Sequence, residues 1–225
     1  MRPFELELES LNQQLLEMGG LVASSVHRSV LSLTEKSEDL AHQVLRDEAR
    51  IDAMEMQIDD FTSRIMARNQ PVARDMRLVI AAIKITTDLE RMGDLAANIV
   101  ERSLSLMHQP PIEAKIDIGR LCSMVENMVL GVLDSFVKQD SDAAAQIMSA
   151  DDAVDQMRNE ISKELLNCMQ NDPSTIVKAL DMLFIARGLE RIADHATNIA
   201  EDVIFLVQGI DVRHQTESIT GQPPR

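Results

Sequence analysis

Two stretches of the sequence repeat the same acidic pattern. "LERMGDLAANIVE" begins at Leu89 and "LERIADHATNIAE" begins at Leu189, 100 residues later. The polar residues shared by the two copies are Glu90, Asp94, Asn98 and Glu101 in the first and Glu190, Asp194, Asn198 and Glu201 in the second. Spacings of four, four and three keep side chains on one face of a helix. Carboxylate and amide oxygens are ligands for hard cations, so this face is a candidate metal site.

A second acidic pair precedes each copy, at an offset of 103 residues between the repeats. The pairs are Glu48 and Asp52 in "EARID" and Asp151 and Asp155 in "DDAVD". The neighbouring Glu55 is not retained, because Arg158 stands at its position in the second repeat. If the helices that carry the two motifs of a repeat pack antiparallel, four carboxylates can face one another. Like charges that close must be protonated, paired with arginine, or bridged by a cation.

Several interpretations of these acids stay open at this point. In an ordinary salt-bridge network, Arg91 and Arg191, with Arg102 one turn beyond, would neutralise them. Alternatively, oxygen-only ligands suit Mg, Mn, Ca or ferric iron. A di-iron site of the ferritin type needs Glu-x-x-His motifs on facing helices, and the sequence contains none.

His195 offers a third possibility, since a histidine on a bundle helix can accept a phosphoryl group in a signalling relay. The first repeat has Leu95 at this position. A lone helical histidine is more often a packed or solvated residue.

The elements that position these residues are helices. The chain has 14 Met, five Phe, and no Trp or Tyr, which suits helices better than strands. Apolar residues at spacings of three and four predict a first helix from about residue 7 to residue 34 and a second through Ile65. Pro71 is placed to begin a third helix, which ends near Met107 before "HQPP".

The pattern then restarts, which predicts an internal repeat of about 100 residues. We expect an all-α protein of two tandem three-helix bundles, that is, six long antiparallel helices of roughly 25 residues or more. The expected units are residues 1–108 and 112–210, followed by a disordered tail at 211–225. Exposed apolar seams on the first and fourth helices suggest a homodimer.

Charge and hydropathy exclude other classes of protein. The 22 Lys and Arg against 37 Asp and Glu give a net charge of −15, which would repel nucleic acid and anionic membranes. No apolar run is long enough to cross a bilayer, and "MRPFELELES" lacks the apolar region of a signal peptide. We therefore expect a cytoplasmic protein without direct membrane insertion.

The paired motifs resemble the E(D)xxxD signature of the PhoU family of phosphate-signalling regulators, and the resemblance covers roughly residues 4–209. It implies metal clusters on the acidic pairs, and no enzymatic activity. It also implies negative regulation of the phosphate-starvation response, by coupling the phosphate ABC transporter, through its ATPase (PstB), to a sensor histidine kinase (PhoR). The metal would be iron, zinc, manganese or magnesium.

Carried over by position, the resemblance implies two metal sites. One consists of Glu48, Asp52, Glu90 and Asp94, and the other of Asp151, Asp155, Glu190 and Asp194. The outlying candidates are Asn98, Glu101, Asn198 and Glu201. In the second site Asp151 replaces a glutamate, which withdraws one carboxylate by a methylene, so the two sites are expected to differ in affinity or in the number of ions. A metal-free helical scaffold remains the alternative.

Overall fold

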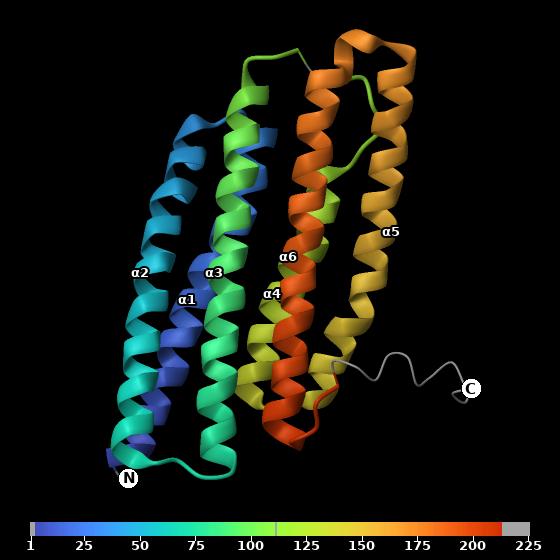
Figure 1. Cartoon of the computed structure of the whole chain (residues 1–225). Helices are drawn as coiled ribbons and strands as arrows, with labels where there is room; N and C mark the ends of the chain where they lie inside the picture. The colour runs from blue at the N-terminus through green and yellow to red at the C-terminus, as the bar shows by residue number, and fades with distance from the viewer. Residues whose placement is uncertain (1–2, 111, 213–225) are drawn as a thin grey trace, which may run out of the picture.

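A computed structural model describes residues 3–110 and 112–212, and these form long helices without a strand (Figure 1). The elements are α1 (Pro3–Thr34), α2 (Glu38–Asn69), α3 (Arg74–Met107), α4 (Ile118–Lys138), α5 (Ser141–Asn171), a 3₁₀ turn η1 (Pro173–Thr175) and α6 (Ile176–Gln208). The first three helices and the last three are the two copies of the repeat. The predicted all-α class and the repeat of three helices are therefore confirmed.

Four helices form the centre of the molecule. α1 packs against α4, and α3 packs against α6, whereas among the described α-helices α2 contacts only α1 and α3, and α5 contacts only α4 and α6. Lys84 Nζ lies 2.6 Å from Asp202 Oδ1 near one end of the α3–α6 contact. Arg102 Nη1 lies 3.1 Å from Asp181 Oδ1 near the other end, so the two helices run antiparallel. α2 and α5 consequently flank opposite sides of the centre (Figure 1).

Helix ends are set by equivalent residues in the two repeats. Ser37 accepts a hydrogen bond from the Leu40 amide at the start of α2, and Asp140, 103 residues later, caps α5 in the same way. Each caps amide groups that have no partner within the helix. The preceding helix of the second repeat, α4, ends at Lys138 and is followed by Gln139 in the left-handed conformation.

Two helix boundaries differ from the prediction. α3 begins at Arg74 rather than at Pro71, because the chain first turns through Ala73, which has a positive φ of 47°. α4 has 21 residues, fewer than the expected 25 or more, because residues 112–117 form no helix before the Asp117 cap. Proline and the residue before it are poorly suited to a helix interior, and the sequence from Pro110 follows that rule.

The apolar seams of α1 and α4 are buried inside one chain. Leu15 and Val22 on α1 are at most 1% exposed, and Val125 and Val129 on α4 are fully buried. The two repeats therefore share one hydrophobic core, and the expectation of exposed seams was wrong. The homodimer that was inferred from them stays a prediction.

The structure describes only the first two residues of the expected C-terminal tail. Residues 213–225 of the predicted disordered tail lie outside the described residues, while Val212 packs partly buried against the core. None of the helices within residues 3–110 and 112–212 is both long and apolar enough to span a bilayer.

Candidate functional site

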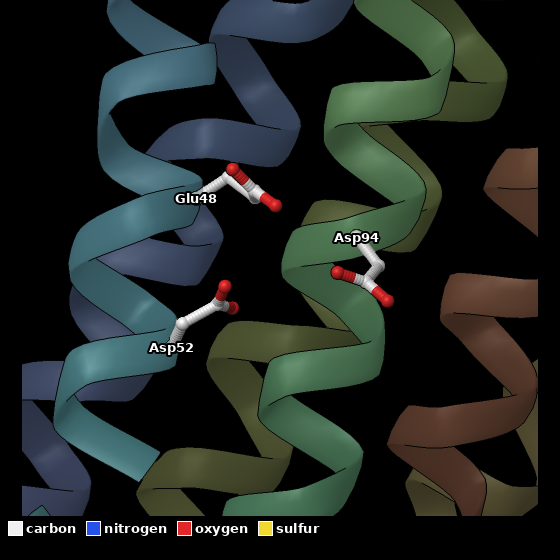
Figure 2. Close-up of side chains that lie close together, drawn as sticks. All are labelled: Glu48, Asp52 and Asp94. Carbon is white, nitrogen blue, oxygen red and sulfur yellow. The ribbon is translucent and has the colours of Figure 1, made fainter. Parts of the chain in front are cut away.

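Three carboxylates of the first repeat converge between α2 and α3. Glu48 and Asp52 project from α2 toward Asp94 on α3 (Figure 2). One oxygen from each lies within 4.8 Å of the others, and all three side chains are half-buried. Within the described part of the chain, this is the one group of three or more His, Cys, Asp or Glu residues with such spacing. Its oxygens can hold a hard cation.

A close helix approach makes this convergence possible. A Cβ atom built on Gly93 would lie 3.0 Å from Ile51 Cδ1, and Ile51 is 1% exposed, so the isoleucine occupies the space that glycine leaves. Gly93 directly precedes Asp94, and Ile51 directly precedes Asp52. The packing of the apolar pair therefore brings the adjacent carboxylates of α2 and α3 to the same level.

Burial and repulsion raise the pKa of Glu48 in this cluster and of Glu90 beside it. Partial burial raises the pKa of Glu48, and the charges of Asp52, Asp94 and Glu101 raise it further. Burial also raises the pKa of Glu90, with Asp94 and Glu55 adding to the shift. The first repeat thus concentrates negative charge that its own residues do not fully neutralise.

Arginine compensates this charge only weakly. Arg91 lies 3.5 Å from Glu90 and 3.9 Å from Asp94, and its side chain is 59% exposed. Arg102, the other expected partner in this repeat, instead pairs with Asp181. An exposed ion pair at such distances contributes little to stability.

The structure adds Glu55 to the acidic face. Partial burial and the charges of Asp59 and Asp52 raise the pKa of Glu55, and Glu55 in turn raises the pKa of Glu90. Because the second repeat does not retain Glu55, comparison of the two repeats does not identify it as a site residue. Its spacing of three from Asp52 on the same helix was the signal that could have identified it.

In the second repeat, Arg158 stands at the Glu55 position and enters the acidic face. Its Nη2 atom lies 2.9 Å from Glu190 Oε1 and 3.8 Å from Asp155 Oδ1. The Arg158 and Glu190 side chains are only 29% and 16% exposed, which makes this a better-buried pair than any that Arg91 forms. A guanidinium group thus occupies part of the space that a cation would need. The second set of four carboxylates therefore fits a metal less well than the first.

The carboxyl group of Asp151, in the second site, is poorly compensated by its surroundings. Its Oδ1 atom is buried without a hydrogen-bond partner. Burial raises the pKa of Asp151 to about 6, with Asp194, Asp155 and Glu190 adding to the shift. Burial and the charge of Glu190 also raise the pKa of Asp194. Arg158 therefore neutralises one side of this site and leaves the Asp151 side crowded.

The outlying polar candidates have several different surroundings. Asn98 donates a hydrogen bond to the Asp94 backbone oxygen at 2.8 Å, while Glu101 contributes to the field at Glu48. Asn198 instead donates to Asp88 Oδ1 across the repeat interface, at 3.3 Å. Glu201 is half-buried.

His195 also lies at the interface between the repeats. Its Nδ1 atom is 2.7 Å from Asp88 Oδ1 on α3, and the two side chains are 19% and 16% exposed. This pair ties α6 to α3, which gives the histidine a structural role.

Comparison with known proteins agrees with this architecture. The family model described as "PhoU domain" matches residues 15–103 and 118–203, one match in each repeat. The chain is 40% identical over 212 residues to a phosphate-specific transport system accessory protein PhoU homolog of Pseudomonas putida, covering 94% of this chain and 83% of the relative.

Solved structures show the same fold. PhoU from Pseudomonas aeruginosa superposes with a TM-score of 0.89 at 39% identity, covering 92% of this chain and all of that chain. The phosphate transport system regulatory protein PhoU from Streptococcus pneumoniae gives 0.87 at 29% identity, covering 93% of this chain and 99% of that one. The chain belongs to the PhoU family.

The Arg158 pair should contribute measurably to stability. We expect Arg158→Ala to lower the free energy of unfolding by about 1–2 kcal/mol, because Glu190 would lose its charged partner in a partly buried site. The matched Arg91→Ala variant should change it by no more than about 0.5 kcal/mol. Urea denaturation of the three proteins measures both values, and equal losses would contradict the assignment of Arg158 as the neutralising residue.

Asp151 should make stability depend on pH. The unfolded aspartate ionises near its ordinary pKa of about 3.9, whereas the folded one holds its proton to about 6. The folded state therefore binds more protons in this window, and its stability falls as pH rises from about 4 to 6.

Asp151→Asn removes this dependence. The variant should match the wild type near pH 4 and exceed its unfolding free energy by about 1 kcal/mol at pH 7.5, after allowance for solvent screening. Urea titrations in chelator at four pH values test this. A variant that is less stable at pH 7.5 would show that ionised Asp151 is well compensated.

Proposed function

We propose that this protein is a regulator of phosphate uptake that acts as a non-enzymatic adaptor. Its relatives are named as accessory proteins of the phosphate-specific transport system, and the likeness covers nearly the whole chain and both repeats. That likeness is the observation that carries the proposal. The adaptor would couple the phosphate ABC transporter, through its ATPase, to a sensor histidine kinase in the cytoplasm, and so repress the phosphate-starvation response.

We further propose that metal binding centres on the first repeat. Glu48, Asp52 and Asp94 supply close oxygen ligands, and Glu90 and Glu55 add negative charge around them. Iron, zinc, manganese and magnesium all accept carboxylates. A bound cation would offset the repulsion and hold α2 against α3.

The proposed second site, formed by Asp151, Asp155, Glu190 and Asp194, would bind metal more weakly. Arg158 already pairs with two of these carboxylates, and a cation would have to displace it. The two carboxylates that Arg158 contacts, Asp155 and Glu190, are also two of the four proposed ligands. The difference between the repeats is thus proposed to be one of affinity.

Metal content of variants tests this arrangement. In protein purified without a metal-affinity tag, we expect Asp94→Asn to remove most of the bound metal and the matched Asp194→Asn to remove little. Arg158→Glu, which restores the residue type of the first repeat, should increase the metal bound per chain. Mass spectrometry of the elements measures all three.

Two results would contradict the metal proposal. Equal, negligible metal in the wild type and in Asp94→Asn would leave a metal-free helical scaffold. Greater loss in Asp194→Asn than in Asp94→Asn would place the stronger site in the second repeat.

The adaptor and phosphotransfer hypotheses differ in what they require of His195. Because the structure pairs this histidine with Asp88, we expect His195→Gln to retain repression of a phosphate-starvation reporter in a host that lacks its own PhoU gene. Glutamine can still donate a hydrogen bond to Asp88. Loss of repression at a normal protein level, with Asp88→Asn still active, would favour phosphotransfer instead.

A further inference from the structure

The contact between α3 and α6 has approximate two-fold symmetry, and the side chains break it. Residues 100 apart occupy equivalent places on the two antiparallel helices. On one half, Asp88 lies 2.7 Å from His195 and accepts a hydrogen bond from Asn198. Lys84 pairs with Asp202 on the same half. This half is filled with complementary charges.

The other half has smaller or apolar residues at the equivalent places. Gly188 stands where the first half has Asp88, and Leu95 stands where it has His195. A cavity of about 340 Å³ lies there. It is lined by Leu95, Asn98, Ile99, Arg102, Phe184, Arg187, Gly188 and Arg191. Gly188 and Leu95 thus leave a pocket where the first half has the hydrogen-bonded Asp88 and His195 side chains.

The lining is strongly basic. Three arginines and no carboxylate line the cavity, although acidic residues outnumber basic ones by 37 to 22 in the whole chain. The Cζ atom of Arg102 lies 4.0 Å from the centre of the Phe184 ring. Asp181 pairs with Arg102 from outside the lining.

Among the described residues, no close carboxylate compensates the positive charge of Arg187 or Arg191 at this pocket. Both are exposed, and among residues 3–110 and 112–212 no carboxylate forms an ion pair with Arg187. Arg191 lowers the pKa of Asp194 through its charge, without a close ion pair. At least two guanidinium groups are therefore available to an incoming anion.

We propose that this pocket binds a small molecule that carries a phosphate or diphosphate group. Guanidinium groups donate paired hydrogen bonds to phosphate oxygens, and several of them around one cavity favour a multiply charged oxyanion. The cavity is at the small end of the range for ligand sites, which suits a metabolite rather than a protein segment. Asn98, on its rim, can add an amide donor or acceptor.

Titration calorimetry with inorganic phosphate, pyrophosphate and ADP tests the proposal on the full chain. We expect saturable binding of at least one of them, one per chain, that weakens as salt rises. The compound that binds most tightly identifies the source of the phosphate group. Each arginine should contribute about tenfold or more in affinity, so Arg187→Gln with Arg191→Gln should weaken binding about 100-fold.

The pseudo-symmetric position supplies the matched control. Arg91 is the equivalent of Arg191 on the other half, and Arg91→Gln should leave phosphate binding unchanged. The exchanged arginines are exposed, so we expect the variants to fold normally. An unchanged melting temperature verifies this. If Arg91→Gln weakened binding as much as the pocket variants do, the effect would reflect the overall charge of the protein, and the proposal would be overturned.

Three other results would overturn it. The first is no saturable binding of any of the three compounds. The second is binding that Asp94→Asn abolishes and the double arginine variant does not, which would place the phosphate on a cation at the acidic face and leave the metal proposal standing. The third is arginine-dependent binding of a poly-glutamate peptide without binding of the phosphate compounds, which would assign the pocket to an acidic protein segment.

Discussion

Crowding of like charges beside a buried apolar seam is the constraint on which the acidic faces depend. Ile51 and Gly93 pack so closely that the carboxylates next to them in sequence must share a small space. The pKa values of the neighbouring Glu48 and Glu90 rise because burial and the charges of nearby carboxylates disfavour their charged forms. The apolar packing of α2 on α3 therefore imposes an electrostatic cost that something else has to offset.

The two repeats offset this cost differently. The second repeat places Arg158 among its carboxylates, so part of the compensation is built into the chain. The first repeat carries Glu55 at that position, and we propose that a cation from solution supplies the compensation there. The same fold thus yields one face that is internally paired and one that is suited to metal. Asymmetry also marks the α3–α6 contact, where the hydrogen-bonded Asp88 and His195 side chains on one half are replaced by an arginine-lined cavity on the other.

Much of this architecture could be predicted from the sequence because it rests on periodicity. Apolar spacing and the repeat predicted six helices, and the occurrence of both acidic motifs in both copies predicted that Asp52 and Asp94 would meet. Periodicity carries no information on how repeats pack, so the shared core of α1 and α4 was missed. The reach of one long side chain was missed as well. Arg158 was visible as a difference from Glu55, but only its rotamer and the helix register bring it to Glu190.

We propose that the first acidic face binds a cation and that Arg158 partly closes the second. Anomalous X-ray scattering from crystals grown with Mn²⁺ locates the ion directly. We expect strong anomalous density among Glu48, Asp52 and Asp94, and weaker density or none between α5 and α6, with Arg158 still paired with Glu190. Equal density at both faces, or density only at the second, would contradict it.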